Sequence, residues 1–226
     1  GGLGNKIGIN IEWINSEDLN SQSLNSKLQN INGIIVPGGF GERGITGKLN
    51  AIKYARLNKV PFLGICLGLQ LAVIEFSLNV LKIKNANSSE FINTENNVIG
   101  LLTEWYKDGK KQIRSKASDV GGTMRLGSYP CKLAKNSLAY KIYKKTNINE
   151  RHRHRYEVNN SFEGKLKEKG MIFSGKSPDL KLPEIIEILD HPWFIGVQFH
   201  PELKSRPFMP HPIFKSFVSA IKKSKS

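Results

Sequence analysis

The chain has 226 residues, of which 39% are hydrophobic and 23% charged, and this is enough apolar material for one sizeable core. No run approaches the roughly eighteen apolar residues that cross a bilayer, and the opening GGLGNKIGIN lacks the apolar core of a signal peptide, so we expect a cytoplasmic protein without a membrane partner. The net charge of +15 raises the alternative of a basic nucleic-acid-binding module, but the lysines are scattered among asparagines, which favours a solvated surface and no nucleic-acid partner.

Strands and helices alternate in the first third of the chain. Residues 6–14, KIGINIEWI, alternate apolar and polar side chains like a half-buried strand, and the polar run after them predicts a loop and a short helix. Residues 33–36 form an apolar run that ends at Pro-Gly-Gly, which predicts a buried strand leading into a glycine loop. An amphipathic helix is predicted over 47–59. An apolar strand over 60–65 then meets an apolar helix without a polar linker.

The rest of the chain predicts further elements of the same kind. The polar, basic stretch 107–116 and the turn-rich stretch 161–181 are predicted to be surface excursions. EIIEIL and FIGVQFHP read as two strands, and HPIFKSFVSAIKK reads as a closing amphipathic helix. This order predicts an α/β fold with a mainly parallel central sheet, helices on both faces and ligands at the carboxyl ends of the strands.

A cysteine lies at the junction of the predicted strand and helix. Gly64-Ile65-Cys66-Leu67-Gly68 has the spacing of a nucleophile elbow, in which the nucleophile occupies a tight turn and the glycines leave room for the backbone. The helix N-terminus that follows favours a thiolate. On residue type alone a free cysteine is more often buried and inert, as we expect for Cys131. The prediction that Cys66 is a nucleophile therefore rests on its position in the elbow.

A base for this thiol is predicted at the end of the strand FIGVQFHP. His200 and Glu202 are two residues apart, so alternation points both side chains the same way. Glu202 can then orient the imidazole through one ring nitrogen while the other faces Cys66. A His-Pro-Glu tripeptide alone is weak evidence for a catalytic pair. It supports one here because the same chain also contains the elbow at Cys66.

Backbone N–H groups are predicted to stabilise an oxyanion beside the cysteine. The elbow supplies the N–H of Leu67, and the glycine loop is predicted to supply that of Gly39, where no side chain obstructs close approach. The same loop matches G-x-G-x-x-G from Gly39 to Gly44, although no ribose-binding acid follows. A phosphate-binding P-loop ending at Lys48 fails in its spacing.

Five segments together resemble a known family, from about residue 31 to residue 220. VPGGFGERG, LGICLGLQ, GGTMRLG, ERHRHRYEVNN and HPWFIGVQFHPELKSRP are similar to the glutaminase domain of the CTP synthases, which are class I glutamine amidotransferases. The resemblance implies that Cys66 attacks the glutamine carboxamide to form a thioester, that His200 acts as general base and acid, and that Glu202 orients His200.

The family's contacts with L-glutamine carry over to seven residues of this chain: Gly39, Leu67, Gly68, Leu69, Gln70, Glu90 and Arg155. Arg155 would hold the α-carboxylate of the substrate and Glu90 its α-ammonium. Leu69 stands where methionine is usual. The R-H-R-H-R alternation before Arg155 also suggests nucleic-acid contact or a metal held by His152 and His154, but the arginines would repel a cation, so we expect no metal.

The resemblance also implies partners outside this chain. A complete enzyme of the family has an N-terminal synthetase domain that uses ATP and Mg²⁺ to convert UTP to CTP with the released ammonia, is activated by GTP, and assembles as a homotetramer. Nothing here resembles that domain, so we expect residues 1–226 to form one glutaminase domain without a cofactor of its own. The rival enzymes are another class I amidotransferase and a γ-glutamyl hydrolase.

Overall fold

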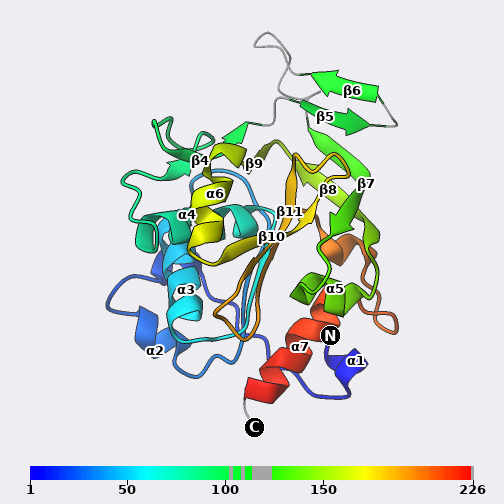
Figure 1. The fold of residues 1–226 in the computed structure, drawn as a ribbon. Coiled ribbons are helices and arrows are strands. Elements are labelled where there is room, and N and C mark those ends of the chain that lie inside the picture. Colours follow the sequence, from blue (N-terminus) through cyan, green and yellow to red (C-terminus); the bar gives the residue numbers. More distant parts are fainter. Residues whose placement is uncertain (102–103, 108–109, 114–123, 225–226) are drawn as a thin grey trace.

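A seven-stranded sheet forms the centre of the molecule (Figure 1), in the strand order β1-β2-β12-β11-β10-β7-β8. The computed structural model describes residues 1–101, 104–107, 110–113 and 124–224. The strands of the sheet are β1 (Ile34–Val36), β2 (Phe62–Ile65), β7 (Arg125–Leu133), β8 (Asn147–His154), β10 (Met171–Lys176), β11 (Pro183–Ile188) and β12 (Phe194–Val197).

The sheet is parallel in one half and antiparallel in the other. β2 pairs in parallel with both β1 and β12, whereas the pairings β12-β11, β11-β10, β10-β7 and β7-β8 are antiparallel. Parallel neighbouring strands need a long crossover connection, which helices supply around β2. The links from β10 to β11 and from β11 to β12 are short, so these strands can pair only in antiparallel orientation. The predicted α/β class is therefore confirmed, and within this seven-stranded sheet the parallel pairing is confined to β1, β2 and β12.

Helices cover both faces of the sheet, as predicted. The helices are α1 (Gly2–Asn5), α2 (Leu24–Leu28), α3 (Ile45–Leu57), α4 (Leu67–Asn79), α5 (Leu138–Tyr143), α6 (Glu163–Glu168) and α7 (Pro212–Ser224), with 3-10 turns η1 (Ser16–Asp18), η3 (Asn160–Phe162) and η4 (Pro201–Lys204). One apolar core lies under α2, α3, α4 and α6, and a second lies under α5 and α7. Alternate residues of β2 enter the two cores, Phe62 the first and Leu63 the second.

Two small sheets complete the fold. β3 (Asn87–Ser88), β4 (Asn97–Leu101) and β9 (Tyr156–Val158) form one, and the hairpin β5 (Glu104–Lys107) and β6 (Lys110–Ile113) forms the other. The basic stretch predicted over 107–116 lies partly outside the described residues. No helix in the described part of the chain is long and apolar enough to cross a membrane.

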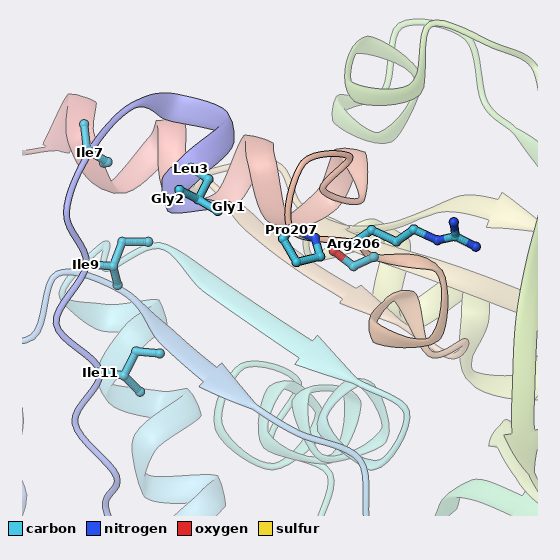
Figure 2. Close-up of a pocket in the computed structure, with 9 residues that line it drawn as sticks. Gly1, Gly2, Leu3, Ile7, Ile9, Ile11, Arg206 and Pro207 are labelled. Carbon is cyan, nitrogen blue, oxygen red and sulfur yellow. The ribbon is translucent and has the colours of Figure 1, made fainter.

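The strand predicted over residues 6–14 is absent from the structure. These residues form no helix or strand after Lys6, and the side chains of Ile9, Ile11 and Trp13 are half or more exposed. β1 is the edge strand of the described sheet and pairs only with β2, so residues 6–14 add no strand to its outer edge. Figure 2 shows its isoleucines beside a surface pocket of about 520 Å³, completed by the first three residues and the turn at 205–207.

The surface excursion predicted over 161–181 is also wrong, because this segment contributes to the core. It contains α6 and β10, and β10 lies inside the sheet between β11 and β7. Leu166 and Met171 are fully buried. The apolar run MIFSG is short and lies between Gly170 and a lysine, so its composition resembles a turn although its neighbours bury it.

Candidate active site

The elbow at Cys66 has the strained geometry that its sequence predicts. Cys66 has φ 52° and ψ −103°, a positive-φ conformation outside the allowed regions that is costly for a residue with a side chain. A Cβ on Gly64 would lie 2.6 Å from the backbone of Gly68, and a Cβ on Gly68 would lie 2.1 Å from the carbonyl oxygen of Val36. Both glycines are therefore required where strand β2 turns into helix α4.

The imidazole of His200 is held by the carboxylate of Glu202. His200 Nδ1 lies 2.6 Å from Glu202 Oε1. Contact with the Cys66 thiol, and then the bond to Glu202, raises the pKa of His200 to about 10. Partial burial acts to raise the pKa of Glu202, but the hydrogen bond from His200 and nearby positive charge outweigh it, so that pKa is lowered. Nε2 of His200 makes no hydrogen bond of good geometry to any described residue.

The second cysteine has a different environment. Cys131 is 1% exposed, in the core under α5 and α7, and burial raises the pKa of its thiol. Cys66 is also buried, at 2% exposure, but it lies beside an imidazole that can accept its proton. The two thiols are therefore distinguished by their neighbours and not by exposure.

The glycine loop lies directly against the cysteine and the imidazole. A Cβ on Gly38 would meet His200 Cε1 at 2.9 Å and Cys66 Cβ at 3.4 Å. Gly39, the residue that the sequence favours as an oxyanion donor, packs against Leu67 instead, where a Cβ would meet Cδ2 at 3.4 Å. The close approach of Gly38 has no sequence signal beyond its place in Pro-Gly-Gly, and the role of Gly39 stays a prediction.

Glu90 also reaches this loop, from a distant part of the chain. Its Oε1 accepts a hydrogen bond of 3.0 Å from the backbone N–H of Gly41, which has φ 78°. A side chain is strained at that φ, so glycine suits the position. The structure thus brings together the predicted Glu90, the glycine loop and the elbow.

The first turn of α4 carries four of the predicted glutamine contacts. The side chains of Leu67 and Leu69 are buried in the core, so these residues face a ligand only through their backbone. The N–H groups of a first helical turn have no intrahelical acceptor, which suits that role for Leu67 and Gly68. The side chain of Gln70 is 3% exposed and donates to the carbonyl oxygen of Tyr156 at 2.9 Å.

Arg155 lies in the short link between β8 and β9. It is half-buried, and its Nε is buried without a hydrogen-bond partner among the described residues. Two residues earlier, the carbonyl oxygen of Arg153 lies 3.8 Å from Cys66 Sγ. The link that carries Arg155 therefore runs past the cysteine.

The histidines of the R-H-R-H-R segment face the interior. His152 and His154 are 1% exposed, and His152 Nδ1 lies 3.0 Å from His154 Nε2. Burial, and then the charge of Arg125, lower the pKa of both rings well below the ordinary value, so they are neutral. No three metal-binding side chains among the described residues are grouped to hold an ion.

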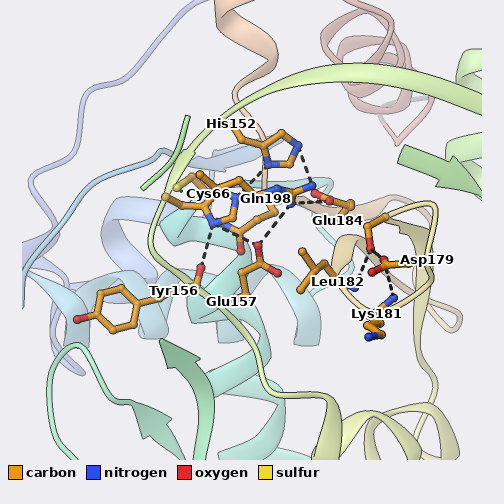
Figure 3. A network of polar contacts seen from close by, with 12 residues as sticks. Cys66, His152, Tyr156, Glu157, Asp179, Lys181, Leu182, Glu184 and Gln198 are labelled. Carbon is orange, nitrogen blue, oxygen red and sulfur yellow. Dashed lines mark hydrogen bonds and ion pairs between the residues drawn. The ribbon is translucent and has the colours of Figure 1, made fainter. Parts of the chain in front are cut away.

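A buried cluster of charges, unsuspected from the sequence, surrounds these histidines (Figure 3). Arg125 Nη1 lies 2.6 Å from Glu184 Oε1 and 3.4 Å from Glu157 Oε1, and all three side chains are nearly inaccessible to solvent. Gln198, fully buried, connects this region to Cys66. These residues lie on β7, β8, β9 and β11 and in the loop after β12, so no local sequence pattern predicts that they meet.

The chain matches the family model described as glutamine amidotransferase class-I over residues 3–220. It is 61% identical to the CTP synthase of Pelagibacter ubique (strain HTCC1062) over 100% of this chain and 42% of that protein, and 57% identical to the CTP synthase of Bartonella quintana (strain Toulouse) over 97% and 41%. The chain thus spans about two fifths of the length of these curated relatives. A solved glutaminase domain of Trypanosoma brucei CTPS with bound acivicin matches with TM-score 0.87 and 36% identity, over 98% of this chain and 84% of that one.

Proposed function

Because the chain belongs to the class I glutamine amidotransferases, as a glutaminase domain of the CTP synthase type, we propose that it hydrolyses L-glutamine to glutamate and ammonia through a thioester on Cys66. The observation that carries this proposal is the strained Cys66 beside an imidazole that Glu202 holds at 2.6 Å. The Trypanosoma brucei relative, solved with acivicin, supports a small-molecule site in the same domain.

The side chains around Cys66 can carry each step of this reaction. With His200 holding the proton, the Cys66 thiolate attacks the carboxamide carbon, and the carbonyl π electrons move to oxygen, near the N–H of Leu67 and the Gly39 loop. The oxyanion collapses, the C–N bond breaks, and His200 donates its proton to the leaving nitrogen as ammonia forms. Water, deprotonated by His200, then attacks the thioester, and the C–S bond breaks to release glutamate.

Arg155→Ala is expected to raise the KM for glutamine roughly 10- to 100-fold while leaving kcat within a few-fold, because a carboxylate contact is made equally in ground and transition states. Steady-state kinetics of glutamate release would measure both constants. Arg151→Ala is the matched control, because Arg151 lies on β8, four residues before Arg155, with an exposed side chain. A lowered kcat at unchanged KM would contradict the assigned role of Arg155.

A glutamine-mimicking chloroketone is expected to alkylate Cys66 and spare Cys131, whose thiol is disfavoured as a thiolate by burial. Peptide mass mapping after partial inactivation would locate the label, and L-glutamine should slow its incorporation. A label on Cys131, or labelling of Cys66 that glutamine does not slow, would refute the proposed function.

We further propose that the protein containing this domain is a CTP synthase. Curated relatives with that name extend well beyond the length of this chain, which supports a synthetase domain as the partner that receives the ammonia. In that assembly, a homotetramer, ATP and Mg²⁺ would serve the synthetase reaction on UTP, and GTP would activate glutamine hydrolysis. CTP formation from UTP by the full protein, with glutamine or with ammonia as nitrogen source, separates this proposal from a γ-glutamyl hydrolase.

A further inference from the structure

We propose that Gln198 is a further catalytic residue of this reaction, whose side-chain amide donates a hydrogen bond to the Cys66 sulfur and stabilises it as the thiolate. The inference rests on the proposed function, because it concerns the same nucleophile. Gln198 Nε2 lies 3.8 Å from Cys66 Sγ, within the range of an N–H to sulfur hydrogen bond, and Figure 3 shows the two side chains together.

The backbone explains why this amide reaches the cysteine. β2 and β12 pair in parallel with Ile65 opposite Val197, and the N–H of Cys66 donates to the carbonyl oxygen of Val197 at 2.7 Å. Gln198 is the next residue, and its backbone is fixed by a 2.8 Å bond to the carbonyl oxygen of Glu184. His200 follows two residues later, so one strand end presents both an amide and an imidazole to the sulfur.

The carbonyl oxygen of Tyr156 determines which groups donate and which accept in the series of hydrogen bonds from Tyr156 through Gln70 and Gln198 to Cys66. The carbonyl oxygen of Tyr156 can only accept, and it receives Gln70 Nε2 at 2.9 Å. The same Nε2 lies 3.4 Å from Gln198 Oε1, which therefore accepts. The Nε2 group of Gln198 is then the part that faces Cys66. Because an amide does not titrate, it remains a donor in every protonation state of the site.

This donor distinguishes the two forms of the cysteine. The thiol can donate its proton to the carbonyl oxygen of Arg153, which lies 3.8 Å from Sγ, whereas a thiolate beside that oxygen loses the bond and is repelled. The N–H of Gln198 offsets this repulsion, because a hydrogen bond to a charged acceptor is stronger than one to a neutral acceptor. Gln198 is 0% exposed, so water does not replace its donor.

Other charged and titratable groups near the sulfur set the background of any pH profile. They are His200 with Glu202 after β12, His152, Arg153 and His154 on β8, Arg155 in the link to β9, Arg125 on β7, Glu157 on β9 and Glu184 on β11. All of these groups are still present when Gln198 is replaced by an apolar residue of similar length. A change in the pH profile of Cys66 reactivity therefore reports the loss of the Gln198 donor.

The test is the rate of alkylation of Cys66 by iodoacetamide as a function of pH, in the wild-type chain, Gln198→Met and Ser77→Ala, with mass mapping to confirm the modified residue. Ser77 is fully buried in α4 and controls for disturbance of the core. We expect Gln198→Met to react about tenfold more slowly near neutral pH, its profile shifted up by about one pH unit, and to converge with wild type at high pH. We expect Ser77→Ala to follow wild type.

A merely structural role of Gln198 predicts a different result, namely slower alkylation by the same factor at every pH. That outcome, or superimposable profiles, would overturn the inference. If Gln198→Met does not fold, as judged by circular dichroism, Gln198→Asn provides the same test, because its shorter side chain withdraws the donor while keeping an amide. Glutamate release by the wild-type chain is measured in parallel, so failure of the proposed glutaminase function is separately visible.

Discussion

Replacing Cys66 with alanine is expected to reduce glutamate release by at least roughly 10⁴-fold, because removing the nucleophile of a covalent mechanism leaves only binding and oxyanion stabilisation. The variant should fold and lose only a little stability, through the small cavity that alanine leaves at this buried position. Release of glutamate and the midpoint of thermal unfolding, measured together, would show both effects.

Cys131→Ala is the matched control, because it removes a thiol of equal size from the same core. It is expected to retain glutaminase activity within a few-fold and to lose some stability through the cavity it leaves. Residual activity of Cys66→Ala near that of Cys131→Ala would rule out a thioester on Cys66, whatever the alkylation results.

Arg125→Met is expected to lower the free energy of unfolding by about 3–5 kcal/mol, because it leaves two buried carboxylates without their shared cation. Arg125 lies within 2.6 Å of Glu184 and 3.4 Å of Glu157, and the side chains of both acids are at most 4% exposed. Chemical denaturation would measure the loss. Arg43→Met is the control, because the pair of Arg43 with Glu17 is exposed, and it should leave the stability unchanged.

The loss in Arg125→Met should depend on pH in a defined direction. Burial raises the pKa of Glu157 and of Glu184 even with the cation present, and Arg125 opposes that rise. A carboxyl with a raised folded pKa contributes most to stability at low pH, and that contribution disappears as pH rises through the folded pKa. Without Arg125 both values rise further, so the difference from wild type should be smaller near pH 5 than near pH 8. A constant difference would show that charge is not the cause.

The part of the site that the sequence predicts is the part that local chain geometry builds. The elbow around Cys66 needs glycines at fixed offsets, which the sequence shows directly. The predicted contact of His200 with Glu202 is present, but strand alternation is not its cause, because β12 ends at Val197 and Glu202 lies in the 3-10 turn η4. The helices α3 and α7 are predicted because their apolar residues recur at helical intervals, and α4 because a long apolar run follows the elbow. In each case the physical cause lies within about a dozen consecutive residues.

The parts of the fold and of the site that the sequence does not predict depend on which distant segments become neighbours. Ile9 and Ile11 alternate like a strand, but alternation buries a face only when another strand pairs with it. β10 lies inside the sheet although its apolar run is short, because β11 and β7 flank it. No sequence pattern indicates a role for Gln198. Its function is visible only once Cys66 and Gln70 lie on either side of it.

The pairing of β2 with β12 also determines when the enzyme can become active during its synthesis. Cys66 and Gln198 are 132 positions apart, so at roughly 5–20 residues per second the ribosome makes them on the order of ten seconds apart. During that interval the nascent elbow has neither His200 nor the amide of Gln198 beside its sulfur. A nascent chain therefore carries an unactivated thiol, and glutamine hydrolysis can begin only when β12 has been made and has inserted beside β2.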